Sequence, residues 1–299
     1  MGITKNCSKF LSYAATQGVS FSETIMLGRQ ELFVTTSEFK DQLMQFNLPS
    51  ANLPESFSEQ FAEPLFHALG ARIIDSIDYS TFEKATVIHD LNLPIPNSLK
   101  KKYTTVFDGG TLEHIFNFPQ AVKNCMDILQ VGGHFILITP TNNQCGHGFY
   151  QFSPELFFSL FADKHGFKTK IVAAGVDIPG TGLRDWYAIE NPHTAKKRVT
   201  LTNSPPTYLM VIAEKTADTE NIVLQPMQSD YQLIWEVYDS MENDIPIKNE
   251  SNLIYYYRKY VPESLKSFVR KITGRSGNTQ KIVEGLGKVN PAFFRKMNI

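Results

Sequence analysis

Tyr103-Thr-Thr-Val-Phe-Asp-Gly-Gly-Thr-Leu-Glu-His-Ile-Phe-Asn117 carries the clearest structural signal in the chain. Its β-branched and aromatic first half predicts a buried strand that ends at Asp108, followed by a glycine turn and a helical pattern. In an open α/β sheet, ligands bind where strands end, because loops converge there and helix amino termini point at the ligand. The segment therefore predicts a binding site near Asp108, Glu113 and His114.

Apolar runs on both sides of this stretch predict six further strands. They cover residues 23–29, 71–79, 85–91, 134–139, 168–174 and 207–214. Helical patterns separate most of these runs, and strands that alternate with helices predict a mostly parallel sheet with helices on both faces. The last strand follows a polar loop, residues 191–206, and no helix. We therefore expect it to run antiparallel, at or near one edge of the sheet.

Proline and glycine mark the expected helix boundaries. Pro119 is expected to open one helix, and Gly132 with Gly133 is expected to end it before the next strand. Ser153 precedes Pro154, which predicts a helix with Ser153 as its N-cap and Pro154 at its first position. Both helices fit the alternating α/β pattern.

The bulk composition is that of a soluble globular protein. Of 299 residues, 42% are hydrophobic and 20% are charged, and the formal net charge of −1 gives no global attraction to nucleic acid. The three cysteines are an odd number without metal-ligand spacing, so a reducing compartment fits better than a disulfide scaffold. The chain has no apolar run long enough to span a membrane and no secretory pattern at its amino terminus. We expect a cytoplasmic protein.

Changes in composition divide the chain into three parts. Residues 1–22 form a lead-in, residues 23–215 carry the α/β pattern, and residues 216–299 form a C-terminal extension. Residues 255–299 hold ten Lys or Arg against two acidic residues. Within them, residues 255–272 predict a basic amphipathic helix, suited either to peripheral contact with an anionic membrane or to packing on the domain. Nucleic acid is not expected as a partner, since no stacking platform or binding motif is present.

Four local patterns resemble those of class I S-adenosylmethionine-dependent methyltransferases. Residues 74–78 (Ile-Asp-Ser-Ile-Asp) and 87–91 (Val-Ile-His-Asp-Leu) are similar to the family's second and third strands. Residues 107–115 resemble its fourth strand with the following Leu-Glu-His turn, and residues 129–137 (Leu-Gln-Val-Gly-Gly-His-Phe-Ile-Leu) the approach to its fifth. The resemblance covers about residues 23–215. It implies a Rossmann-like α/β fold: a seven-stranded, mostly parallel sheet with helices on both faces and a reversed last strand, plus a helical C-terminal extension.

The resemblance also implies S-adenosylmethionine as the cofactor. Asp78 would bind its ribose hydroxyls, since a carboxylate accepts two hydrogen bonds at once, and Asp90 would lie by its adenine. The expected cofactor-binding residues are Gly28, Asp78, Asp90, Asp108, Gly109 and Glu113. Without a ligand, the same acids can be explained as caps of turns or helix starts.

The turn after the first strand departs from the family pattern. In the family an acid and a glycine-rich turn stand there, because glycine lets the backbone approach a ligand and adopt a positive φ. Here residues 26–32 read Met-Leu-Gly-Arg-Gln-Glu-Leu, with one glycine and Arg29 where small residues are expected. Glu31 is a candidate substitute acid. The departure leaves two interpretations, a different mode of cofactor binding or a member of the family that has lost catalysis.

Methyl transfer needs alignment above all, and a base when the acceptor must lose a proton. His147 and Tyr150, in the loop after the fifth strand, and His114, after the fourth, are the candidate catalytic residues. Histidine suits this role because it titrates near neutral pH. Alternatively, the loop is an apolar lid and His114 makes a structural hydrogen bond. The scattered His, Asp and Glu residues show no tight metal spacing, so no metal site is expected.

The sequence thus predicts methyl transfer from S-adenosylmethionine to O or N of a small-molecule acceptor, which is expected to be sugar-like or lipid-linked. The alternative is a non-catalytic methyltransferase-like binding module with a degenerate cofactor loop. A nicotinamide-dependent Rossmann enzyme is disfavoured, since the chain lacks Gly-x-Gly-x-x-Gly.

Overall fold

The strand that ends at Asp108, β6 (Tyr103–Asp108), is buried along its whole length inside a nine-stranded sheet. The computed structural model describes residues 2–57, 60–195, 198–218, 222–232, 235, 281–283 and 285–299. Within these residues the strand order is β14-β9-β8-β11-β7-β6-β2-β4-β5. The other strands are β2 (Glu23–Leu27), β4 (Ile73–Asp78), β5 (Val87–Ile88), β7 (Leu129–Asn142), β8 (Phe167–Asp177), β9 (Arg184–Ile189), β11 (Thr207–Lys215) and β14 (Phe294–Lys296).

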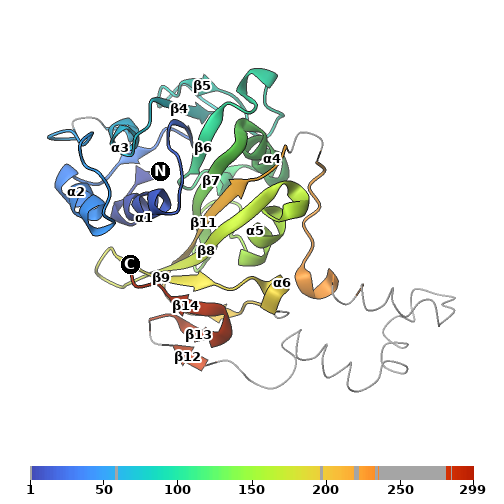
Figure 1. Cartoon of the computed structure of the whole chain (residues 1–299). Coiled ribbons are helices and arrows are strands. Elements are labelled where there is room, and N and C mark those ends of the chain that lie inside the picture. Colours follow the sequence, from blue (N-terminus) through green and yellow to red (C-terminus); the bar gives the residue numbers. More distant parts are fainter. Residues whose placement is uncertain are drawn as a thin grey trace, which may run out of the picture.

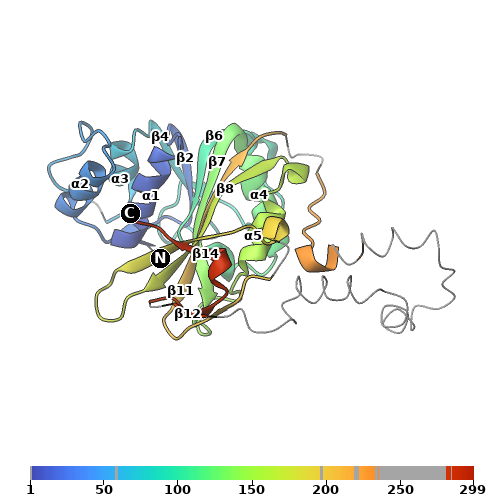
Figure 2. The ribbon, with the colours of Figure 1, turned by 60° about the horizontal axis from the view of Figure 1, so that its bottom comes forward.

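Helices cover both faces of this sheet (Figures 1 and 2). On one face lie α1 (Lys5–Thr16), α2 (Thr36–Gln45) and α3 (Glu63–Ala68), and on the other α4 (Phe118–Ile128) and α5 (Pro154–Leu160). Shorter elements are α6 (Pro192–Ala195), η1 (Asn97–Leu99), η2 (Leu112–His114), η3 (Asp163–His165) and η5 (Pro291–Phe293). Two small sheets complete the described elements, with β1 (Gly2–Ile3) on β3 (Glu31–Leu32), and β13 (Gly287–Val289) between β10 (Leu201–Thr202) and β12 (Lys281–Val283).

Alternation along the strands builds a separate core on each face. Val106 packs into the cluster that α4 and α5 complete, whereas the next residue, Phe107, packs into the cluster under α1, α2 and α3. Ile25 and Met26 of β2 divide in the same way. Successive strand residues point to opposite faces, so a strand covered on both sides must be apolar throughout. This explains why the buried strands show continuous apolar runs.

The reversed strand is confirmed, but the mostly parallel pairing, the strand count and the position of that strand are corrected, because the sheet is mixed, with four parallel and four antiparallel strand pairs. Five strands pair in parallel from β7 to β5, and β11 is antiparallel to both its neighbours, β7 and β8. The sheet has nine strands, however, and three of them lie beyond β11. Sequence patterns missed β9 and β14 because β9 opens with the charged pair Arg184-Asp185 and β14 is three residues long.

The expected helix end at Gly132 and Gly133 is wrong. Helix α4 ends at Ile128, and both glycines lie in β7. Gly132 has φ 83°, and a Cβ on Gly133 would lie 3.0 Å from the carbonyl oxygen of Thr104 in β6. The glycines therefore let β7 bend closely against β6. The expected N-cap of α5 is confirmed, since the Ser153 hydroxyl accepts the Glu155 backbone N–H at 3.2 Å.

The two ends of the described chain meet at one side of the molecule. In the lead-in helix α1, Phe10 packs edge-on against Trp186 of β9 at 5.7 Å, and Lys9 donates to the carbonyl oxygen of Ile299 at 2.9 Å. Within residues 281–283 and 285–299, strands and η5 stand where a helical extension was expected, and β14 pairs with β9. The predicted basic helix at 255–272 lies outside the described residues. Among those that are described, no helix is long and apolar enough to cross a membrane.

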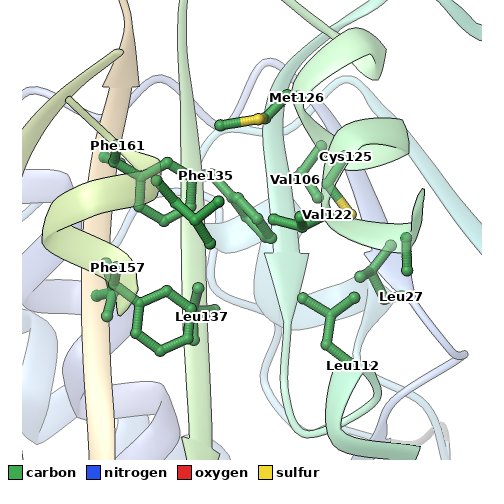
Figure 3. Packing of buried hydrophobic residues seen from close by; sticks show 14 of the residues in the cluster. Leu27, Val106, Leu112, Val122, Cys125, Met126, Phe135, Leu137, Phe157 and Phe161 are labelled. Atoms are coloured by element: carbon green, nitrogen blue, oxygen red, sulfur yellow. The ribbon is translucent and has the colours of Figure 1, made fainter. Parts of the chain in front are cut away.

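Leu112 anchors η2 in the core on the α4 face. Figure 3 shows it beside Leu27 and near Val122, and its side chain is 1% exposed. Leu112→Ala should lower the free energy of unfolding by about 2–5 kcal/mol, because it removes buried methyl groups and leaves a cavity. Urea unfolding measures this change. Leu93→Ala, at a leucine that is 57% exposed, should change it by less than about 0.5 kcal/mol, and equal losses in the two variants would contradict the anchoring role.

Candidate functional site

The turn after β6 is organised by the carboxylate of Asp108. Its Oδ1 accepts the backbone N–H groups of Gly110 at 3.1 Å and of Thr111 at 2.7 Å. The Thr111 hydroxyl in turn donates to the carbonyl oxygen of Leu27, at the end of β2, at 2.8 Å. These three hydrogen bonds join the ends of β6 and β2 and start η2 directly after the turn. Glu113 of η2 is therefore buried and His114 is exposed.

Two carboxyl groups are buried at this strand end. Asp108 and Glu113 are both 0% exposed, and Asp108 Oδ2 has no hydrogen-bond partner among the described residues. Glu113 Oε2 accepts the Thr139 hydroxyl at 3.3 Å. Burial raises the pKa of both carboxyl groups well above their usual range, and the charge of Glu113 raises that of Asp108 further. The site therefore favours a neutral carboxyl group or a bound cation.

The loop after β7 folds back over Glu113. The carbonyl oxygen of Glu113 accepts the N–H of Phe149 at 2.7 Å and that of Tyr150 at 3.3 Å. Gly148 lies so close that a Cβ there would be 2.9 Å from Glu113 Cγ. This packing brings His147 Nε2 to 3.3 Å from Glu113 Oε1. The sequence predicted these residues separately, and the structure joins them.

The rings of His114 and His147 meet edge-on, with their centroids 5.1 Å apart. Partial burial, and then the proximity of His147, lower the pKa of His114. A neutral imidazole at neutral pH can accept a proton, which is what a general base requires.

Tyr150, the third candidate base, is held in a structural contact. Its hydroxyl donates to the carbonyl oxygen of Phe116 at 2.7 Å, and its ring stacks on Phe152 at 5.8 Å. Phe152 is part of the core and is 5% exposed. These contacts explain the position of Tyr150 without a catalytic role.

The predicted cofactor residues Gly28, Asp78 and Asp108 lie along one edge of the sheet, because β4, β2 and β6 are neighbouring parallel strands. Gly28 has φ 65°, and a Cβ there would lie 3.2 Å from Thr111 Oγ1 and 3.8 Å from Asp78 Oδ2. Asp78 Oδ1 accepts the N–H of Ser80 at 2.9 Å. The absence of a side chain at Gly28 thus leaves space between the two acidic strand ends.

Asp90 follows β5, at the far end of the same edge. Its Oδ1 accepts the backbone N–H of Asn92 at 2.9 Å and the side-chain amide of the same residue at 2.7 Å. These hydrogen bonds lower the pKa of Asp90. The geometry is that of a turn in which an aspartate bonds two residues ahead, which was the alternative explanation for this residue.

Gln30 is the site residue that sequence reasoning missed. Its amide Nε2 donates to the carbonyl oxygen of Leu27 at 2.7 Å, and its Oε1 is buried with no hydrogen-bond partner among the described residues. A Cβ on Gly109 would lie 2.7 Å from that oxygen. Gln30 therefore fills space between the turns after β2 and β6. The sequence signal for Gln30 was its position in the turn after β2, which departs from the family's glycine-rich pattern.

Arg29, the unexpected basic residue of that turn, is bound to the neighbouring helix. Its Nε donates to Glu63 Oε1 at 2.7 Å, and its guanidinium lies 4.1 Å from the centroid of the Phe61 ring. The positive charge is paired at α3, so it does not need a ligand to balance it.

A cavity of about 590 Å³ opens at the end of β8, away from the predicted residues. Its lining includes Asn6, Asp177 and Arg184, and none of the nine predicted site residues. Arg184 pairs with Asp177 at 2.6 Å and stacks over the Tyr208 ring at 3.6 Å. Its charged groups are thus bonded to one another.

No family model and no curated protein matches this sequence. Among solved structures, the chain is similar to an S-adenosylmethionine-dependent methyltransferase of Thermotoga maritima, described as a possible histamine N-methyltransferase, with 14% identity, a TM-score of 0.36, and coverage of 70% of this chain and 88% of that one. It is similar to the Burkholderia thailandensis 1,6-didemethyltoxoflavin-N1-methyltransferase bound to S-adenosylhomocysteine, with 13% identity, a TM-score of 0.38, and coverage of 71% and 80%. A third is the branched-chain polyamine synthase of Thermus thermophilus, with 11% identity, a TM-score of 0.37, and coverage of 75% and 58%. At TM-scores below 0.5, these likenesses do not decide the chemistry of this chain.

The buried Asp108 carboxyl should make the stability of the protein depend on pH. A carboxyl group whose pKa is raised by folding ionises more readily in the unfolded chain, so stability is lost as the pH rises above about 4. Asp108→Asn removes this ionisation. The difference in free energy of unfolding between the variant and the wild type should therefore grow in favour of the variant as the pH rises. Between pH 4.5 and pH 8 it should grow by at least about 1.4 kcal/mol, the free energy that corresponds to a pKa change of one. Urea unfolding at both pH values measures the difference.

The matched control is Asp41→Asn, since Asp41 is exposed on α2. Its stability relative to the wild type should not change with pH. An Asp108→Asn variant that tracks the wild type at both pH values would show that the buried carboxyl does not carry the predicted penalty.

Proposed function

We propose that the chain binds S-adenosylmethionine along the edge formed by the ends of β6, β2, β4 and β5 and transfers its methyl group to O or N of a small-molecule acceptor. The supporting observation is the row of Asp108, Gly28 and Asp78 on neighbouring parallel strand ends. In open α/β sheets this edge is where ligands bind. Bound there, the cofactor supplies an electrophilic methyl group.

The residues present fit such a ligand in two places. Asp108 Oδ2 is a buried acceptor without a partner among the described residues, which suits a cationic amino group. Gly28 leaves space in front of Asp78, whose carboxylate is exposed enough to receive a diol. Gly109, Glu113 and Asp90 complete the proposed set, with Asp90 supported least because its Oδ1 already closes a turn.

Gln30 favours the second candidate, a methyltransferase-like module that binds without turnover. Gln30 lies in the turn after β2, where the family pattern has small residues, and its side chain lies against Gly109. A ligand at this place must either displace the amide or bond to its Oε1. Displacement breaks the hydrogen bond to Leu27 and weakens binding. Retained binding without methyl transfer would support this candidate.

For the enzyme, we propose His114 and His147 as the groups that take the acceptor's proton. Both are exposed at the strand end and lie beside Glu113, whose Oε1 is 3.3 Å from His147 Nε2. Tyr150 is the weaker candidate, because its hydroxyl already donates to Phe116. The sugar-like or lipid-linked character of the acceptor, the division at residues 22 and 215, and membrane contact through the extension remain proposals from the sequence.

Calorimetric titration with S-adenosylmethionine, and separately with S-adenosylhomocysteine, tests the proposal. Micromolar binding is expected, and Asp78→Ala should weaken it about tenfold or more, because a buried diol would lose a charged acceptor. Asp41→Ala is the control and should bind like the wild type. Absence of binding by folded protein, or unchanged affinity in Asp78→Ala, would contradict the assignment.

A further inference from the structure

We propose that Glu113, His114 and His147 form a binding site for a divalent transition-metal ion such as Zn²⁺. Across the described residues, His, Cys, Asp and Glu side chains come close enough to hold a metal ion in this one place. The three ligand atoms lie within 4.8 Å of one another. This site goes beyond the proposed function and does not depend on it.

The geometry is close to what a metal ion requires. Ligand atoms about 2.0–2.2 Å from a tetrahedral Zn²⁺ lie roughly 3.3–3.5 Å apart. His147 Nε2 and Glu113 Oε1 are already 3.3 Å apart. The ligand atom of His114 lies at most 4.8 Å from the other two. To reach the tetrahedral spacing, it has to move inward by roughly 1.5 Å or less. Because His114 and His147 are both exposed, their rings can make this adjustment.

The donor set is one that metals select. Two imidazoles and one carboxylate hold catalytic zinc and leave a coordination position open, and the same set with open positions suits other first-row divalent ions. The exposed histidines give the ion access from solvent, and the buried carboxylate supplies charge that water does not screen. A cation there would offset the cost of burying the Glu113 carboxylate, whose side chain is fully buried.

The surrounding structure orients each ligand. The Thr139 hydroxyl donates to Glu113 Oε2, which leaves Oε1 as the oxygen nearest His147. The loop that carries His147 is held on Glu113 by the N–H of Phe149 at 2.7 Å. This approach requires glycine at 148, where φ is 70° and a Cβ would lie 2.9 Å from Glu113 Cγ. Gly146, on the other side of His147, has no atom within 4 Å of its Cβ position.

The site assigns Glu113 to a metal in place of the cofactor. With an ion bound, the lone pairs of both histidines are used for coordination, so neither is free as a general base. An acceptor hydroxyl bound at the open position would then lose its proton to water more easily, because a metal ion lowers the pKa of an oxygen ligand. The small-molecule acceptor that fits both this site and the proposed reaction is therefore a hydroxyl compound, an inference that rests on the proposed function.

The test is a titration of the full chain with Zn²⁺ after removal of metal by a chelator. The protein carries no polyhistidine tag and has Cys145→Ser, since Cys145 is an exposed thiol that would bind zinc on its own. One Zn²⁺ per chain is expected. His114→Ala and His147→Ala should each weaken binding by at least about tenfold, as losing a ligand costs no less than losing its outer partner. His193→Ala, at an exposed histidine on α6, should have no effect.

The two glycines that flank His147 provide a second comparison. Gly148→Ala should also weaken zinc binding, because its Cβ pushes the loop away from Glu113, whereas Gly146→Ala should bind like the parent protein. No stoichiometric binding, or equal affinity in the histidine variants and the parent, would overturn the site. Titration with S-adenosylmethionine is independent. Zinc binding without cofactor binding would overturn the proposed function alone, and the reverse result would overturn the metal site alone.

Discussion

The hydrogen bonds from Gly110 and Thr111 to the carboxylate of Asp108 are the constraint on which the site depends. They turn the chain sharply at the end of a fully buried strand, and the hydroxyl of Thr111 ties that turn to β2. Everything that follows is set by this turn. Leu112 enters the core, Glu113 enters the protein beneath the loop after β7, and His114 faces solvent. A side chain that bonds its own backbone can shape such a turn without any ligand, so the geometry exists before binding.

The same turn concentrates negative charge where water is scarce. Asp108 and Glu113 are both buried, and the described residues supply few donors for them: backbone N–H groups of the turn for Asp108, and the Thr139 hydroxyl for Glu113. Buried carboxylates are costly unless a positive group or a proton accompanies them. The proposed cationic group of a cofactor at Asp108 Oδ2 and the proposed metal ion at Glu113 Oε1 would each meet this need. The two bound groups are compatible in charge, but an ion would replace the base role proposed for His114 and His147 and the cofactor contact proposed for Glu113.

The candidate site residues lie on one half of the sheet, and the additional strands lie on the other half. The strands β2, β4 and β6 bring the candidate residues to one edge, and their parallel pairing is what the alternating pattern predicts. Beyond β8 the sheet continues through β9 and β14, and β14 belongs to the far end of the chain. A fold of this kind supports many reactions, and the chemistry is decided by side chains such as Gln30 at the strand ends. Gln30 lies in the turn where this chain departs from the pattern that it resembles.

The sequence by itself determined the α/β class, the antiparallel direction of β11 and the neighbouring strand ends that carry Gly28, Asp78 and Asp108, because strand periodicity and strand-end acids are local signals. It also marked the individual residues Asp108, Glu113, His114 and His147. Only the tertiary structure decided that Glu113, His114 and His147 meet. His114 and His147 are 33 residues apart in the sequence, and the loop after β7 reaches η2 because Gly148 allows the close approach to Glu113. Likewise, Tyr150 is drawn into a structural hydrogen bond with Phe116, and β14 joins the sheet, by contacts between segments that are distant in sequence. Such contacts produce no periodic pattern in the sequence, because tertiary packing, and not the neighbouring residues in the chain, selects each partner.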